Sequence, residues 1–179
     1  MKRVDVYVLV SMLVKKQKPE TLEHWGARTG LSVSVLHRCL KQLQKSMLIV
    51  ESDKGYDPVF RNLKEFLITG FPYVFPEEKG KLQRGFVTGI DGSSLKGDFV
   101  DSEFPFVWAH YEGDTKGFSI EPLHKAIPDL ISSNRLDSDL YEILALLDVL
   151  RTGQRREIEA AKRRLSELVE HYEQQVFAD

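Results

Sequence analysis

Three side chains that could carry out acid–base chemistry stand close together in the string WAHYEGD, at residues 108–114. His110, Glu112 and Asp114 alternate along this string, and alternation along a β-strand would project all three to one face of an ordinary exposed sheet. Catalysis needs groups with defined roles, and no nucleophile or third partner is supplied beside these three. We therefore predict no catalytic residue here and no enzyme activity for the chain.

The string TGIDGSSLKG, at residues 88–97, could cradle a phosphate because it combines glycine with serine. A Walker-type phosphate loop also needs lysine followed by serine or threonine after its last glycine, and then a helix. Both are missing. The string predicts a glycine-rich turn between strands.

Histidine and cysteine are too scattered to form a metal site. The chain contains His24, His37, His110, His124, His171 and a single cysteine, Cys39. Their separations match no spacing typical of zinc ligands. We predict no metal and no cofactor. Cys39 falls at an apolar helix position, which favours a small buried hydrophobic side chain over a redox sensor.

The string GLSVSVLHRCLKQLQ, at residues 30–44, separates apolar from polar residues at helical spacing. A helix from about residue 32 to 46, with Ser32 as N-cap, would bury Leu36, Cys39, Leu40, Leu43 and Met47. The predicted DNA-contacting residues are Ser32, Ser34, His37, Arg38, Lys41, Gln42 and Lys45. Short polar side chains near a helix start suit base edges, and long basic ones suit phosphates. We expect Ser34, His37 and Arg38 near bases, and Lys41 and Lys45 near phosphates.

Positive charge is concentrated in the same part of the chain. The net charge is −2, but residues 1–60 hold ten Lys or Arg against six Asp or Glu, a net +4. Residues 61–130 and 131–179 are each at −3. A net +4 over sixty residues is mild and by itself favours ordinary variation over a nucleic-acid contact, so such a contact must be argued from the arrangement of the elements.

Short elements around residues 30–44 would position that helix. The apolar spacing predicts helices over residues 5–16, 20–29 and 32–46, then a hairpin with strands 48–51 and 56–60 around a turn at 52–55. Two helices that cross steeply need a small residue where their backbones approach and a flexible one at the turn. Gly26 or Ala27 would serve the approach and Gly30 the turn, with Leu31 as a buried anchor.

The stretch TLEHWGARTGLSVSVLHRCLKQLQKSMLI, followed by the hairpin through Gly55, resembles the winged helix-turn-helix domain of bacterial transcriptional regulators, the MarR-like group in particular. The resemblance covers about a third of the chain. It implies DNA binding by the helix at residues 32–46 in a major groove, with Lys54 at the wing tip near the backbone or a minor groove. The wing of this chain departs from the pattern of a DNA-contacting wing. Glu51, Asp53 and Asp57 accompany the single Lys54, and their carboxylates would repel phosphate unless they point away from it.

The remaining residues predict a different mixture of elements. A helix over 61–70 would end at Gly70 before Pro72, and residues 76–119 would hold loops with two or three short strands. A short helix would start at 122 and either end at 126 or continue beyond Pro128. Two antiparallel helices, 139–151 and 155–175, would follow. The class is α+β, with a winged helix-turn-helix domain at 1–60 and a mixed α/β, then helical, domain at 61–179.

Two charged or apolar strings in this second part have structural explanations. GFPYVFPEEKGKLQRG, from residue 70, predicts a rigid packed domain junction, with a ligand or partner site as the alternative. The basic residues of RTGQRREIEAAKRRL, from residue 151, are interleaved with Glu157, Glu159 and, just after the string, Glu167. This pattern predicts a solvated, salt-bridged helix face.

Composition is that of a soluble protein, with 42 % hydrophobic and 29 % charged residues. No window approaches the roughly 18 to 20 apolar residues of a membrane span. The start, MKRVDVYVLVSMLVKK, is not a signal peptide, because Asp5 interrupts the apolar run and two lysines replace a cleavage site. A lone cysteine agrees with a cytoplasmic location.

Two functions follow as hypotheses. The first is a sequence-specific DNA-binding regulator, a repressor acting as a homodimer on double-stranded DNA, since one recognition helix reads few base pairs. The second is a partner-binding protein whose acidic residues 61–179 neutralise another protein. Its architecture is similar to that of antitoxins of the abortive-infection type, whose partner is a nucleotidyltransferase toxin.

Overall fold

The computed structural model describes residues 1–14, 20–53 and 55–178, and the side chains as far as residue 176. Its elements, in chain order, are α1 (Arg3–Leu13), α2 (Leu22–Thr29), α3 (Val33–Lys45), β1 (Ile49–Ser52), β2 (Gly55–Pro58), α4 (Phe60–Glu65), the π-helical η1 (Phe66–Gly70), α5 (Phe71–Val74), β3 (Leu82–Val87), the 3-10 helix η2 (Gly89–Gly92), β4 (Phe106–Ala109), β5 (Thr115–Ile120), α6 (Ala126–Ser132), α7 (Ser138–Thr152) and α8 (Arg155–Ala178). The predicted α+β class is confirmed.

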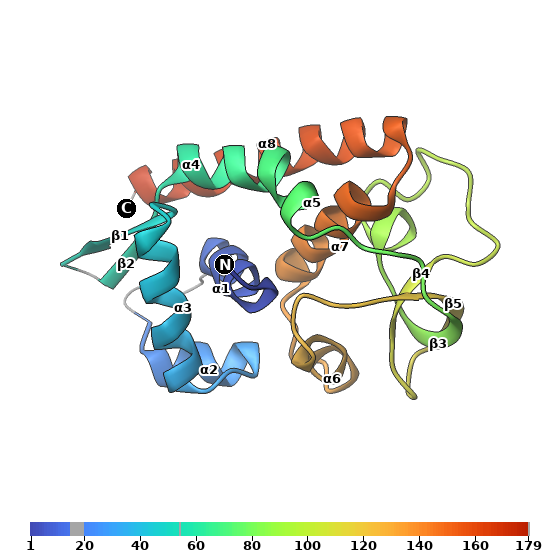
Figure 1. Cartoon of the computed structure of the whole chain (residues 1–179), viewed down its shortest axis with the longest axis horizontal. Helices are drawn as coiled ribbons and strands as arrows, with labels where there is room; N and C mark the ends of the chain where they lie inside the picture. Colours follow the sequence, from blue (N-terminus) through green and yellow to red (C-terminus); the bar gives the residue numbers. More distant parts are fainter. Residues whose placement is uncertain (15–19, 54, 179) are drawn as a thin grey trace.

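Helix α1 lies at the centre of the molecule, between α3 and α7 (Figure 1). The sequence predicted one apolar stripe on a helix starting at residue 5. The helix instead starts at Arg3, and every side chain from Asp5 to Val14 is buried. The prediction of a single buried face was incomplete, because α3 and α7 cover α1 on both sides and bury its other face as well. Its predicted end at Lys16 lies outside the described residues.

A close approach of backbones joins α2 to α3. A Cβ added to Gly26 would lie 2.5 Å from the carbonyl oxygen of Leu31, so Gly26, rather than the exposed Ala27, occupies the approach. Gly30 has a φ of 69°, the left-handed conformation expected for a helix-ending glycine. Leu31, Leu36 and Cys39 are buried as predicted.

The end of α3 corrects the prediction for Met47, whose side chain is 70 % exposed. The backbone leaves the helix there with a φ of 57° at Met47. The N–H of Leu48 donates to Leu43 O at 3.1 Å, and that of Met47 to Gln44 O at 3.0 Å. This pair of bonds is a Schellman motif. It turns Met47 to solvent, and Leu48 enters the core in its place.

The predicted hairpin follows directly. Strands β1 and β2 pair antiparallel, with Ile49 opposite Pro58 and Ser52 opposite Gly55. Each strand lies within two residues of its predicted bounds. The loop between them holds Asp53 and the undescribed residue 54.

The next helix does not end at Gly70 as predicted. It continues through a π-helical turn, in which Phe71 N–H donates to Phe66 O, into α5 with Pro72 near its start. The wider turn moves the hydrogen-bonding pattern by one residue, and this accommodates a proline that would otherwise interrupt the helix. Phe71 and Phe75 are buried, whereas Tyr73 and Val74 are exposed.

Residues 82–120 form three short strands, as expected for the middle region. Strands β3, β4 and β5 close on one another, with β3 antiparallel to both neighbours and β4 parallel to β5. One detail is wrong in the prediction: β4 ends at Ala109. His110, Glu112 and Asp114 therefore occupy the turn before β5 and do not alternate along a strand. The string at 88–97 forms η2 and turns, as predicted.

The carboxyl-terminal helices match the prediction except for the first. Helix α6 begins at Ala126, four residues after the predicted start, and contains Pro128. Asp137 caps α7, and α8 packs against both α7 and α4 (Figure 1). Within the described residues, no helix has both the length and the apolar character needed to cross a bilayer.

A buried polar cluster ties α7 to the strands. The Asp148 carboxylate accepts hydrogen bonds from the Thr88 hydroxyl at 2.7 Å and the Trp108 indole N–H at 2.8 Å. Arg151 pairs with the same carboxylate and, at 2.9 Å, with Glu77. Since a buried charge is costly without partners, these bonds fix how the strands sit on α7.

Candidate nucleic-acid interface

The candidate interface is the exposed side of α3. Ser32 is the N-cap, and its hydroxyl accepts the Val35 N–H at 3.4 Å. Most of the predicted contact residues are exposed: Ser32, Ser34, His37, Arg38, Lys41 and Lys45. Gln42 is half-buried and donates to the Ser46 hydroxyl at 3.2 Å. The polar face is therefore where the periodicity predicted it.

The opposite side of α3 anchors the helix. Leu36, Cys39, Leu40 and Leu43 are each 0 % exposed. Burial raises the pKa of the Cys39 thiol to about 12, and the nearby Asp5 carboxylate contributes in the same direction. A thiol so rarely ionised is a poor nucleophile, which agrees with a packing role.

Basic side chains of α3 meet the start of α1 around a shallow hollow of about 360 Å³. The hollow is lined by Met1, Lys2, Asp5, Arg38, Lys41, Gln42 and Lys45. Asp5, which is 5 % exposed and accepts the backbone N–H of Lys2 at 2.6 Å, offsets only one of these four positive charges. Sequence reasoning missed Lys2. The only signal for it was charge at a helix start, and its position beside α3 is a tertiary feature.

The cations of this hollow are available to an external anion. Lys2, Arg38, Lys41 and Lys45 form no ion pair with any residue that the structure describes. Like charges this close repel one another, and a polyanion relieves that repulsion while releasing its own counterions. The other predicted residues, Ser32, Ser34 and His37, do not line the hollow.

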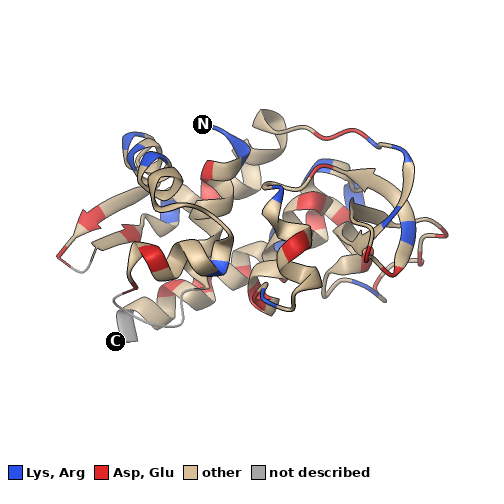
Figure 2. Ribbon diagram, turned by 90° about the horizontal axis from the view of Figure 1, so that it is seen from below, with Lys and Arg blue, Asp and Glu red and all other residues tan. Residues whose placement is uncertain are grey.

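The hairpin carries the opposite charge. In Figure 2, blue positions gather on α3 at upper left, and red positions lie on the strands of the hairpin below it. Glu51 and Asp53 are exposed, while Asp57 is half-buried. The predicted wing contact of Lys54 lies outside the described residues.

His110, Glu112 and Asp114, in the turn before β5, each have a different side-chain partner outside this group of three. His110 Nε2 lies 3.2 Å from Asp129, Glu112 accepts the Ser132 hydroxyl, and Asp114 accepts that of Thr115 at 3.0 Å. Across the described part of the chain, no three His, Cys, Asp or Glu side chains gather as metal ligands.

A second basic cluster lies at the start of α8. Part of the helix is salt-bridged as predicted, with Lys162 paired to Glu159 at 3.0 Å and Arg164 to Glu167 at 3.3 Å. Three arginines depart from the prediction: Arg155, Arg156 and Arg163 line a hollow beside Phe99. They form no ion pair with other described residues, because the interleaved glutamates pair elsewhere.

Comparison of the chain with protein-family models, curated proteins and solved structures gave no match.

Proposed function

We propose that the chain is a sequence-specific DNA-binding transcriptional regulator, with a winged helix-turn-helix domain in residues 1–60 and α3 as its recognition helix. The observation that carries the proposal is the hollow beside α3. There Arg38, Lys41 and Lys45 face solvent on a helix whose other side is fully buried, Lys2 lies beside them at the start of α1, and the four cations have no described ion-pair partners. Such a helix presents base-reading and phosphate-binding groups together.

The elements around α3 support the same proposal. Gly26 allows α2 and α3 to approach closely, Gly30 makes the turn, and a two-stranded hairpin follows α3. This order is that of a winged helix-turn-helix. Ser34 and His37, at the exposed start of α3, would face base edges, and Lys41 and Lys45 would face phosphates.

The assembly on DNA would be a homodimer, and its effect repression. One recognition helix reads few base pairs, and a two-fold operator read by two copies supplies the rest. The helices α7 and α8 form the long carboxyl-terminal pair from which a dimer contact would be built.

Fluorescence anisotropy with labelled duplexes tests the proposal. The purified chain is titrated with DNA from upstream of its own coding sequence and with a shuffled duplex, over a series of salt concentrations. The native duplex should bind more tightly. Because Arg38 contacts a base and Lys41 a phosphate in the proposal, Arg38→Ala with Lys41→Ala should weaken binding to the native duplex at least about tenfold and lower the salt slope by about one.

A charge-matched control separates α3 from general electrostatics. Arg155→Ala with Arg163→Ala removes the same two charges from exposed positions on α8 and should leave both affinity and slope nearly unchanged. If the two double variants behave alike, or if no duplex is retained in a salt-sensitive way, the proposal fails.

The second candidate function is partner binding of the antitoxin type through residues 61–179. It is favoured by large apolar side chains exposed in that part, including Val100 at 93 %, Tyr73 at 83 % and Tyr111 at 82 %. Tyrosine is among the side chains enriched in protein interfaces. Co-expression with the neighbouring reading frame, followed by size exclusion, tests it. A stable complex weakened by Tyr73→Ser or Tyr111→Ser would support it, and separate elution of the two products would exclude it.

A further inference from the structure

The arginines at the start of α8 surround an open hollow of about 520 Å³, here called the arginine hollow. Its lining consists of Arg155, Arg156, Arg163, Glu159 and Phe99. The volume lies within the roughly 300–1,000 Å³ of small-molecule sites. In Figure 1, the start of α8 and α3 lie at opposite ends of the molecule. The arginine hollow is therefore separate from the proposed DNA interface.

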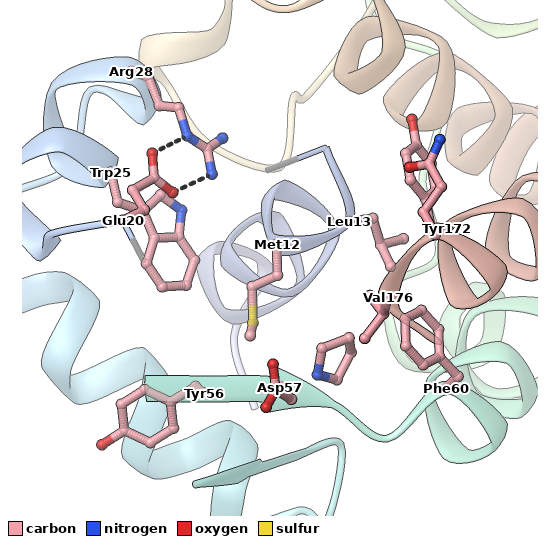
Figure 3. A pocket seen from close by; sticks show the side chains of 12 residues that line it. Met12, Leu13, Glu20, Trp25, Arg28, Tyr56, Asp57, Phe60, Tyr172 and Val176 are labelled. Atoms are coloured by element: carbon pink, nitrogen blue, oxygen red, sulfur yellow. Dashed lines mark hydrogen bonds and ion pairs between the residues drawn. The ribbon is translucent and has the colours of Figure 1, made fainter. Parts of the chain in front are cut away.

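The three arginines of the hollow lack the partners that other arginines of this protein have. Arg28, for example, donates to both carboxylate oxygens of Glu20, at 2.7 and 2.9 Å (Figure 3). A guanidinium engaged in this bidentate way has little left for a ligand. The arginines of the hollow are exposed and form no ion pair with any residue in the described part of the chain.

The carboxylates near the hollow leave its positive charge in place. Glu159, the one carboxylate among the described lining residues, pairs with Lys162 at 3.0 Å. Asp98 and Asp101 stand on either side of Phe99 in the sequence, are exposed and do not line the hollow. The flanking segments, 93–105 and 153–163, are described throughout. Among the described lining residues the formal charge is therefore +2, and an external anion would neutralise it.

The spacing of the cations suits a chain of phosphates. Arg155 and Arg163 are eight residues apart on α8, which corresponds to about 12 Å at the rise of a helix. Each guanidinium is a planar fork that donates two parallel hydrogen bonds to phosphate oxygens, which the ammonium of lysine does not. One phosphate would contact one or two of these side chains, whereas a chain of phosphates would contact all three.

Phe99 forms an apolar wall beside these cations. Its half-buried side chain packs against the hydrophobic core. The loop that precedes it is held on α7, because the Ser94 N–H donates to Glu142 at 2.8 Å and Leu95 is buried. An aromatic ring in a fixed position offers a surface on which a nucleobase stacks.

We propose that the arginine hollow binds a nucleoside polyphosphate. The phosphates contact Arg155, Arg156 and Arg163, and the base packs against Phe99. Because the arginines are exposed, their attraction for the phosphates is screened by salt. A duplex bound at α3 would lie at the other end of the molecule, so this inference does not rest on the proposed DNA-binding function.

Isothermal titration calorimetry on the full chain, in magnesium-free buffer without DNA, tests the site with four probes: ATP, AMP, inorganic tripolyphosphate and hexaglutamate. ATP should bind most tightly, and added salt should weaken its binding. Tripolyphosphate, which lacks a base, should bind about fivefold more weakly. AMP has one phosphate and hexaglutamate has none, and both should bind about tenfold more weakly than ATP or worse.

Two neighbouring arginines provide a matched pair of variants. Arg163 lines the hollow, whereas Arg164 pairs with Glu167 at 3.3 Å. Arg163→Ala should weaken ATP binding about fivefold or more, and Arg164→Ala should change it less than about twofold. Phe99→Leu keeps an apolar side chain and removes the ring. It should lower the affinity for ATP to that for tripolyphosphate and leave tripolyphosphate binding unchanged.

Four results would each overturn the proposal: ATP binding that is absent or insensitive to salt, tripolyphosphate binding as tight as that of ATP, hexaglutamate binding as tight as that of ATP, or equal losses from Arg163→Ala and Arg164→Ala. The first three are measured on the unaltered chain, so they do not depend on the folding of a variant. Because the titration contains no DNA, its result is independent of the anisotropy experiment on duplex binding.

Discussion

Single residues show how position alters the chemistry of a common side chain. Five histidines occur in the sequence without a pattern, and His124 becomes distinctive only in the fold. Its ring stacks on Tyr7 with 5.8 Å between centroids, and its Nδ1 accepts the Ala126 N–H at 3.2 Å. Burial lowers the pKa of His124, and the neighbouring Lys125 lowers it further.

The first prediction concerns the pH dependence of stability. An unfolded histidine has a pKa of about 6.5. Because the folded pKa lies below that value, the unfolded state takes up the proton first as pH falls. His124 should therefore leave stability intact above about pH 6.5 and reduce it increasingly below. The free energy of unfolding in urea, measured from pH 7.5 to 5.5, should decline.

The variant His124→Asn keeps an acceptor for Ala126, because its Oδ1 takes the place of Nδ1, and it cannot titrate, so part of that decline should disappear. His24→Asn, on the exposed face of α2, serves as the control and should keep the wild-type profile. Identical pH profiles for His124→Asn and the wild type would show that His124 contributes nothing to the dependence.

At the level of elements, helix ends explain most differences between sequence and structure. Periodicity locates the body of α3 well, because its apolar set recurs at three and four residues. It cannot identify the residue at which the chain leaves the helix, since that depends on which carbonyls the following N–H groups reach. The Schellman motif at Met47 and the π-helical turn before Pro72 are both of this kind.

The second prediction follows from Met47. A residue other than glycine pays a conformational cost in the left-handed region, and this side chain is too exposed to recover it by burial. Met47→Gly should stabilise the protein by about 0.5–1 kcal/mol. Chemical denaturation measures this change.

Asn134, with a φ of 54°, is the matched control for Met47. Asparagine tolerates the left-handed region better than methionine does, so Asn134→Gly should gain less. A destabilised Met47→Gly variant would mean that the methionine side chain makes a contribution its exposure does not reveal.

For the whole molecule, the main feature is a hydrophobic core that contains residues from both sides of the predicted domain boundary at residue 60. Helix α1 packs on α3 and on α7, and the buried hydrophobic cluster runs from Val6 to Tyr172. Ion pairs also connect the two sides of this boundary, because Glu77 pairs with Arg3 at 3.0 Å as well as with Arg151. The division at residues 1–60 and 61–179 remains a prediction about sequence organisation.

The third prediction is that the chain unfolds as one unit. Trp25 and Trp108 are its two tryptophans and lie on opposite sides of residue 60. The variants Trp25→Phe and Trp108→Phe each leave one fluorescent probe. In urea, each probe should report the same transition as circular dichroism on the same variant, since unpacking α1 would expose the core of both parts.

Two separate transitions would contradict this expectation. If the Trp108 probe changed at a lower urea concentration than circular dichroism of the same variant, while Trp25 reported a later step, residues 1–60 would be an independently stable domain. That outcome would favour the division made from sequence.

By itself, the sequence determined the local features of this protein: the α+β class, the helices with strong periodicity, the hairpin, the polar face of α3 and the glycines at 26 and 30. These follow from interactions between residues a few positions apart, which composition and spacing encode. Tertiary structure alone decided that α1 is enclosed on both sides, that Lys2 joins the basic face of α3, and that Asp57 lines one recess with Trp25 and Tyr172. Such contacts join residues far apart in the chain, and no local pattern records which distant surfaces will meet.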